Sequence, residues 1–270
     1  MTAQRPADGT VGKALQVLDQ VAAFGRPVRF SELLSGSGFP KATLYRFLQT
    51  LTSQGVLSYE PERQTYAPGL RLLRLAHAAW RQSSLAPVAR PHIDRLSAEI
   101  GETVHLAQLD NGQVLYVDKR NAAAPIAMYS EAGKVGPAYC TGVGKAMLAF
   151  LDGAERARAL DQQAFHRFTP ATLPDAAALE RELTAIRARG HALDREEHEP
   201  GIICAALPIL TPGGRVLGAV SVTSSTARRG LEELERLAPV LRRAAEAIAA
   251  EAEAWRFPDD DDAMREAGAA

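Results

Sequence analysis

The chain has 270 residues, a length that accommodates about two domains. Hydrophobic residues make up 46% of it and charged residues 23%, which is enough apolar material for a core and excludes a chain disordered throughout. Lysine and arginine number 31 against 32 acids. The net charge of −1 therefore excludes a uniformly basic nucleic-acid-binding protein but leaves room for a local basic face.

The cysteine content and the N-terminal sequence indicate the cellular compartment in which the protein is expected. Cys140 and Cys204 are too few for a disulfide framework or a four-cysteine zinc site and suit a reducing cytosol. The polar opening segment lacks the apolar stretch of a signal peptide, and the chain contains no apolar run long enough for a transmembrane helix. We therefore expect a soluble, cytoplasmic protein without membrane contact.

The first part of the chain predicts the order helix, helix, turn, helix, hairpin. Apolar residues recur at helical spacing, and glycines follow the first and third helices, as is common at helix C-termini. Ser31 is predicted to cap the second helix with its hydroxyl. The expected elements are helices over residues 11–24, 31–35 and 41–54 and a β-hairpin over residues 56–68. This order is typical of a winged helix-turn-helix domain, here residues 1–69.

The third helix has the chemistry of a DNA-recognition helix. Its polar face contains no acid and offers Lys41, Thr43 and Arg46 near its N-terminus, where such helices meet base edges and phosphates. Residues 1–82 hold ten basic and five acidic residues, so this part is about +5 and suits a phosphate backbone. The predicted DNA contacts are Arg29, Ser31, Pro40, Lys41, Ala42, Thr43, Tyr45, Arg46, Gln49 and Arg63.

The rest of the chain predicts a linker helix and a mixed α/β domain. Residues 70–83 have helical spacing with three arginines and no acid, which suggests a connecting helix. Asn111-Gly112 lies between two alternating segments and predicts a tight hairpin. Strands are also expected at residues 126–131, 203–210 and 215–224, and helices at residues 85–100, 142–151, 173–190 and 230–256. The second domain is expected over residues 84–256, and residues 257–270 are expected to form an acidic, disordered tail. The predicted fold class is α+β.

Several segments together resemble the IclR-type bacterial transcriptional regulators. They are VGKALQVLDQVA and GFPKATLYRFLQTLTSQGVL in the first domain, and ETVHLAQLDNGQVLYVDK, CTGVGKAMLAF, DREEHEPGI and GAVSVTS in the second. The likeness runs over about residues 11–250. It implies a regulator, not an enzyme, that binds double-stranded operator DNA as a homodimer or homotetramer and requires no cofactor.

The same resemblance implies that the second domain is GAF-like and binds a small effector. The glycines around residue 142 and the start of the following helix would place free N–H groups toward an anion, so a small organic acid, aromatic or sugar-derived, is expected. Whether the regulator represses or activates stays open. The implied effector-binding residues are Met128, Ala138, Tyr139, Cys140, Thr141, Gly142, Val143, Asp194, Glu196, Cys204 and Ser221.

Other kinds of chemistry fit the sequence less well. The segment around Lys145 lacks the residues of a phosphate loop or a dinucleotide fingerprint. The acids and histidines of residues 191–198 do not have the spacing of a helical metal site, and no metal is expected. A cytosolic small-molecule-binding enzyme with an accessory helical domain, a serine or cysteine hydrolase, and a protein-interaction adaptor are the alternatives that remain.

Overall fold

A computed structural model describes residues 9–83 and 85–254 of the chain. The chain divides into two compact units, residues 1–82 and 83–270, each of which is described by itself. The predicted acidic tail, residues 257–270, lies outside the described residues. Within the described part, no helix combines the length and the apolar character needed to cross a membrane.

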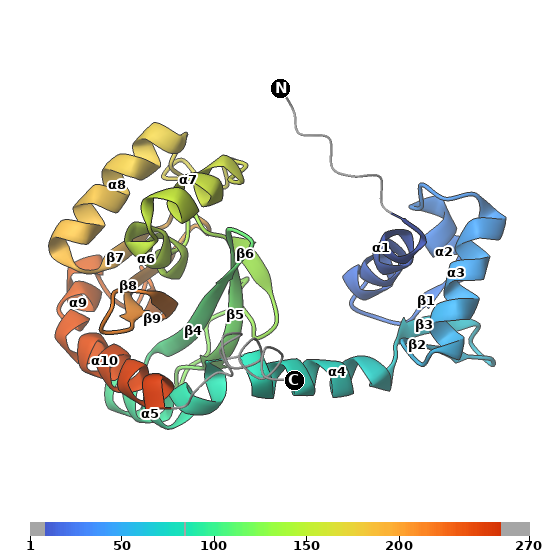
Figure 1. Ribbon diagram of the computed structural model, residues 1–270, viewed down its shortest axis with the longest axis horizontal. Helices are drawn as coiled ribbons and strands as arrows, with labels where there is room; N and C mark the ends of the chain where they lie inside the picture. The colour runs from blue at the N-terminus through green and yellow to red at the C-terminus, as the bar shows by residue number, and fades with distance from the viewer. Residues whose placement is uncertain (1–8, 84, 255–270) are drawn as a thin grey trace, which may run out of the picture. The chain divides into compact units, whose positions relative to one another are not determined.

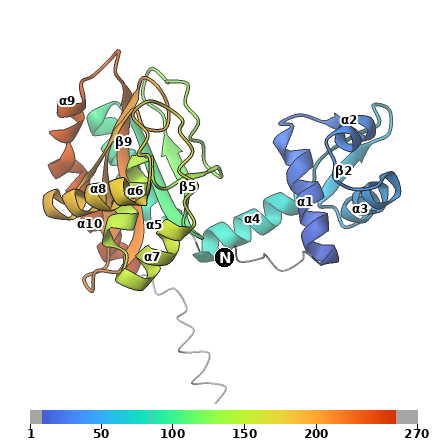
Figure 2. The same cartoon turned by 90° about the horizontal axis from the view of Figure 1, so that it is seen from above.

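The described residues of the N-terminal unit before α4 form three helices and a small antiparallel sheet (Figures 1 and 2). The helices are α1 (Thr10–Ala23), α2 (Phe30–Ser35) and α3 (Lys41–Ser53). The strands are β1 (Val28–Arg29), β2 (Leu57–Glu60) and β3 (Thr65–Pro68), in the order β1-β3-β2. The helix-helix-turn-helix order and the β2–β3 hairpin are confirmed. The short strand β1, which extends the wing sheet, was not predicted.

One apolar core holds this unit together. It joins Val17 and Val21 of α1, Leu33 of α2 and the buried stripe of α3 to the wing sheet. Gly25 and Gly55 follow α1 and α3 with positive φ angles of 63° and 68°, which a glycine adopts without steric cost. The prediction that Ser31 caps the second helix was wrong. The N-cap is Arg29, whose backbone N–H donates to the carboxylate of Glu32 at 2.9 Å.

Helix α4 (Leu70–Ser83) follows the wing and coincides with the predicted connecting helix. Three of its leucines are exposed, Leu70 at 78%, Leu73 at 67% and Leu75 at 55%, and Leu72 is half-buried. Among the described residues of this single chain, no apolar side chains cover these exposed leucines.

The C-terminal unit is a six-stranded antiparallel sheet with helices on both faces (Figure 1). The strand order is β6-β5-β4-β9-β8-β7. The strands are β4 (Thr103–Asp110), β5 (Gln113–Arg120), β6 (Val135–Pro137), β7 (Ala192–Arg195), β8 (Ile202–Leu210) and β9 (Val216–Ser225). The β4–β5 hairpin turns at Asn111 and Gly112, both with positive φ, as its Asn-Gly sequence predicts.

Six helices complete the described part of this unit. They are α5 (Ala86–Ile100), α6 (Gly142–Phe150), α7 (Gly153–Asp161), α8 (Ala176–Arg189), α9 (Leu231–Glu235) and α10 (Ala238–Ala254). Figure 1 shows α5 and α10 on one face of the sheet and α6 with α8 on the other. The core beneath α6 includes Tyr139, Met147, Leu148 and Leu183.

Two predicted elements of this unit were wrong. Residues 126–131 form no strand, and the edge strand lies later, at Val135–Pro137, where it pairs with residues 113–115 of β5. The single helix expected over residues 230–256 is two helices, α9 and α10. Pro239 explains the interruption, because proline has no N–H to continue a helix but is tolerated in its first turn.

Candidate DNA-reading surface and effector cavity

Helix α3 presents one apolar and one polar face. Leu44, Phe47, Leu48 and Leu51 are buried at helical spacing, and this stripe packs the helix against the core. The opposite face carries Lys41, Arg46 and Gln49, all exposed. The polar face is therefore open to solvent.

The structure places the predicted DNA contacts on the outside of the N-terminal unit. Nine of the ten are exposed and Thr43 is half-buried. Five of them, Arg29, Ser31, Lys41, Ala42 and Tyr45, line one shallow hollow together with Phe30, Tyr59, Gln64 and Tyr66. Tyr45 is 54% exposed at the rim of this hollow. Helix α3 and the wing thus share one continuous surface.

The predicted contact residues on this surface include four cations, Arg29, Lys41, Arg46 and Arg63, and no acid. Among the described acids of this unit, Glu32 forms an ion pair with Arg26 at 2.7 Å, whereas Glu60 and Glu62 lie exposed in the wing. The ion pair and the Arg29 N–H lower the pKa of Glu32. Lys41, Arg46 and Arg63 have no carboxylate partner among the described residues, so they are free to meet phosphates.

A narrow cavity lies in the C-terminal unit, between α6 and the ends of strands β4, β8 and β9. Its lining brings together seven of the eleven predicted effector residues: Met128, Thr141, Gly142, Val143, Asp194, Cys204 and Ser221. The lining also includes His105, Tyr116, Ser130, His198, Glu199, Ile202 and Thr223. Among the described residues, the lining contains no lysine or arginine, so an anion here would be held by N–H groups, hydroxyls and the His198 ring.

The N-terminus of α6 forms one wall of this cavity. Thr141 is the N-cap, but its hydroxyl donates to the carbonyl of Pro137 at 2.7 Å and caps no N–H. The first backbone bond runs from Lys145 N–H to the Thr141 carbonyl, and the preceding N–H groups have no acceptor within the helix. A Cβ on Gly142 would lie 2.3 Å from the sulfur of Cys204, so only glycine allows this close approach to β8.

Asp194 places a carboxyl group in the same wall. Its Oδ1 accepts the backbone N–H of Glu197 at 2.8 Å. Burial raises the pKa of Asp194 from 3.8 to about 7, the charge of Lys145 opposes that rise and the charge of Glu197 adds to it. The Lys145 ammonium bonds the Glu197 carboxylate and the Leu193 carbonyl, which fixes the turn after β7 to α6. Asp194 is thus a group that gains or loses its proton near neutral pH.

His105 is a buried polar centre that the sequence analysis missed. Its Nε2 lies 2.8 Å from the Ser130 hydroxyl, and its Nδ1 lies 3.2 Å from Thr223 Oγ1 and 3.4 Å from Ser221 Oγ. Burial, aided by the charge of Lys119, lowers the pKa of His105 to about 3. The ring is therefore neutral and carries one N–H and one acceptor nitrogen.

Four predicted effector residues lie outside the cavity lining. Ala138, Tyr139 and Cys140 belong to the core under α6, and the Tyr139 hydroxyl donates to the carbonyl of His166 at 2.6 Å. Glu196 has a positive φ of 62°, and its carboxylate accepts the N–H of Gly201 at 2.6 Å, which stabilises the turn between β7 and β8.

The two-residue period of a strand contained a signal for one of the missed residues, Thr223, whereas the position of His105 follows from the register seen in the structure. Thr223 follows Ser221 by two positions on β9, so both point to the same face of the strand. His105 pairs with Ser221 across β4 and β9, which makes it a direct cross-strand neighbour. Ser130, His198 and Glu199 lie in irregular segments, where no periodicity could place them.

The geometry speaks against hydrolase chemistry at this site. Ser221 lies beside His105, but a histidine with so low a pKa is a poor base, and its other nitrogen meets a hydroxyl instead of a carboxylate. Burial raises the pKa of Cys140 and Cys204, which keeps both thiols protonated. In the part of the chain that the structure describes, no group of three acids, histidines or cysteines could hold a metal ion.

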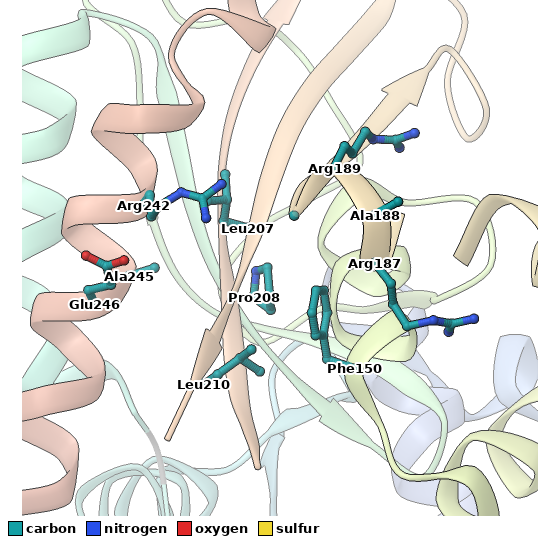
Figure 3. A pocket seen from close by; sticks show the side chains of 11 residues that line it. Phe150, Arg187, Ala188, Arg189, Leu207, Pro208, Leu210, Arg242, Ala245 and Glu246 are labelled. Atoms are coloured by element: carbon teal, nitrogen blue, oxygen red, sulfur yellow. The ribbon is translucent and has the colours of Figure 1, made fainter. Parts of the chain in front are cut away.

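A second hollow opens between α8, β8 and α10 (Figure 3). Figure 3 shows Arg242 extending from α10 toward Leu207, with Pro208 and Phe150 on the floor. Arg187 and Arg189 already donate to Ala149, Thr184, Glu182 and His191. None of the predicted effector residues lines this hollow, so it serves as a reference surface away from the cavity.

Comparison with known proteins follows the same division of the chain. Residues 10–61 match the IclR helix-turn-helix domain, and residues 77–250 match the bacterial transcriptional regulator IclR C-terminal domain. The HTH-type transcriptional regulator XynR of Escherichia coli is 31% identical over 90% of this chain and 96% of its own length.

Two solved structures share the fold over most of the chain. The Thermotoga maritima IclR structure aligns with a TM-score of 0.72 at 30% identity, over 90% of this chain and 98% of that one. An IclR homologue from Microbacterium hydrocarbonoxydans, crystallised with 4-hydroxybenzoate, aligns with a TM-score of 0.78 at 22% identity, over 91% and 100% of the two chains. The relatives are transcriptional regulators and not enzymes. This chain therefore belongs to the IclR family of DNA-binding transcriptional regulators, with a helix-turn-helix domain and an effector-binding C-terminal domain.

Proposed function

We propose that the regulator responds to a small hydroxylated organic acid bound in the α6 cavity. The observation that carries this proposal is the composition of the lining: N–H groups in the first turn of α6 and neutral hydroxyls, with no lysine or arginine side chain. A helix N-terminus favours a carboxylate, and the hydroxyls of Ser221 and Thr223 can donate to it. Asp194 and Glu199 are acceptors for hydroxyl groups on the same molecule.

The acid is aromatic or sugar-derived in this proposal. Tyr116, Met128 and Ile202 supply an apolar side to the lining, whereas the acceptors suit several hydroxyl groups. The Microbacterium protein of the same fold was crystallised with 4-hydroxybenzoate, an aromatic hydroxy acid, and this compound is included in the test.

On the DNA side, α3 enters the major groove and the wing contacts the backbone. The open acid-free face of α3 supports this role, with Lys41, Thr43, Arg46 and Gln49 toward the DNA and Arg29 and Arg63 toward phosphates. Two copies of the chain bind a dyad-symmetric operator, and effector binding shifts the equilibrium between two quaternary arrangements. Helix α4 is the covalent connection through which that shift passes.

A thermal-shift screen tests the effector assignment. Gluconate, 4-hydroxybenzoate and other hydroxy acids are each compared with their neutral amides on the full chain. We expect a stabilising acid whose amide has little effect, and we expect Ser221→Ala to reduce the acid's shift. Arg242→Ala, at the hollow of Figure 3, is the matched control and should respond as the unmodified chain does.

DNA binding separates a specific effect from misfolding. Ser221→Ala without effector should bind an operator selected from random duplexes as tightly as the unmodified chain. Loss of DNA binding as well would indicate a misfolded variant. If amides stabilise the protein as well as acids do, the assignment of an organic acid is overturned.

A further inference from the structure

His105 joins three hydroxyl groups of the effector cavity into one hydrogen-bonded cluster. The ring is 3% exposed, and its partners Ser130, Ser221 and Thr223 are also buried. Ser130 lies on one side of the ring, at Nε2, whereas Thr223 and Ser221 share the other side, at Nδ1. All four residues line the cavity.

The ring can satisfy these partners in two ways. With the proton on Nε2, the ring donates to Ser130, and Nδ1 accepts a hydrogen bond from the hydroxyl of Thr223 or Ser221. That hydroxyl then turns its oxygen lone pairs, and not its proton, toward the cavity. With the proton on Nδ1, the ring donates to Thr223 or Ser221, and Ser130 donates to Nε2. Both strand hydroxyls are then free to donate into the cavity.

We propose that His105 is a positioning residue whose tautomer sets whether the cavity donates or accepts hydrogen bonds, and that a carboxylate selects the Nδ1–H form. This inference rests on the proposed function, since it assumes a carboxylate in the α6 cavity. A neutral ring is required, and burial of His105 supplies it. The N-terminus of α6 attracts the carboxylate, and the strand hydroxyls complete its hydrogen bonds on the side of β9.

The cluster also links the cavity to the segment after β5. Ser130 belongs to that segment, and its carbonyl accepts from the Lys119 ammonium at 2.7 Å while its hydroxyl meets His105. A change of tautomer reverses the direction of the Ser130 hydrogen bond. Binding of a carboxylate to the hydroxyls of β9 would thereby change, through the His105 ring, the hydrogen bond of Ser130 in the segment after β5.

Two substitutions separate the tautomers. Asparagine at position 105 places an amide N–H where Nδ1–H would be, whereas glutamine places one near Nε2. His105→Asn should keep the affinity for acetate, the simplest carboxylate probe, within about threefold of the unmodified chain. His105→Gln should weaken acetate binding by about tenfold, and neither variant should change the response to acetamide.

The decisive measurement is nitrogen NMR of the full chain labelled with ¹⁵N-histidine. The six histidines are distinguished by comparison with His105→Asn, and His191→Gln controls for replacement of another buried histidine bonded elsewhere, to Glu235. With saturating acetate, we expect the His105 proton on Nδ1. A proton on Nε2 in the acetate complex overturns the proposal, as does equal acetate affinity of the two variants.

Failure of this inference differs from failure of the proposed function. If organic acids stabilise the chain in the thermal-shift screen but His105 carries its proton on Nε2, the tautomer proposal alone is wrong. If neither acetate nor any acid of the screen binds, both the organic-acid assignment and the tautomer proposal are wrong. If His105→Gln has a lowered unfolding temperature without probe, the spectrum of the unmodified chain still decides.

Discussion

Asp194 is a buried residue whose pKa the fold raises into the neutral range. Its pKa is raised from 3.8 to about 7, chiefly because the carboxyl group is buried. Between about pH 4 and about pH 7 the unfolded chain has already lost this proton while the folded chain retains it. The free energy of unfolding should therefore fall as the pH rises through that window and level off above it.

The substitution Asp194→Asn tests this linkage. Asparagine keeps an oxygen for the N–H of Glu197 but cannot ionise. We expect the free energy of unfolding at about pH 8 to rise by about 1–3 kcal/mol, and its decline between about pH 4 and about pH 7 to flatten. Urea titrations across that range measure both effects. Asp175→Asn, at an exposed carboxylate that caps α8, is the control, and an equal gain there would refute burial as the cause.

Arg46 is the residue on which the DNA-reading role can be tested most directly. It is exposed on α3 with no acid beside it among the described residues. Arg46→Ala should weaken binding to a selected operator by about 1–3 kcal/mol. Titration by fluorescence anisotropy at several salt concentrations checks this, with Arg158→Ala on α7 as the control. An unchanged affinity at every salt concentration would remove Arg46 from the interface.

Sequence patterns predicted the exposure or burial of single residues where a pattern constrained them. The exposed face of α3 follows from helical period, and the resemblance supplied seven residues that the structure gathers around one cavity. His105 was missed because a histidine inside an apolar strand has no motif of its own. Its partners come from β9 and from the segment after β5, and only tertiary structure brings them together. The roles of these residues remain predictions.

At the scale of elements, the α6 N-terminus depends on close backbone contact. A Cβ on Gly144 would lie 2.4 Å from the carbonyl oxygen and 2.5 Å from the Cα of Ala138, so backbone would have to move. Gly144→Ala should therefore lower the free energy of unfolding by about 2 kcal/mol or more and weaken acid binding. Calorimetry and the thermal-shift assay measure the two effects.

Gly153→Ala provides a matched control for this prediction. Gly153 begins α7, and an added Cβ there meets nothing within 4 Å. Because alanine favours helices, this variant should be neutral or slightly stabilised. Equal destabilisation of both variants would mean that the loss of glycine at a helix start, and not the contact with Ala138, explains the Gly144→Ala result.

Elements were predictable where local chemistry was strong and were missed where tertiary pairing decided. The Asn-Gly hairpin and the amphipathic helices α1 and α3 carry their signals in sequence. Strand β6 has three residues and exists because it pairs with the edge of β5, so no period could reveal it. The segment at residues 126–131 has the apolar content of a strand but finds no neighbouring strand to pair with.

At the scale of the whole molecule, exposed apolar residues indicate where copies of the chain meet. Val11 and Leu15 lie one turn apart on α1 and are 75% and 52% exposed, and Leu70, Leu73 and Leu75 of α4 are exposed as well. An unpartnered apolar stripe of this kind is typical of an oligomer interface. We therefore expect a homo-oligomer whose dimer contacts include the outer face of α1.

Leu15→Lys tests this arrangement, because a charge in an apolar interface loses its hydration without gaining a partner. The dimer should weaken by about 2 kcal/mol or more, which sedimentation equilibrium measures. Operator affinity should fall with it, since two recognition helices on one dyad bind only when the chains are joined. Lys13→Gln changes an exposed residue between Val11 and Leu15 on another face of α1 and should leave assembly intact. A Leu15→Lys protein that sediments as the unmodified chain does would place the interface elsewhere.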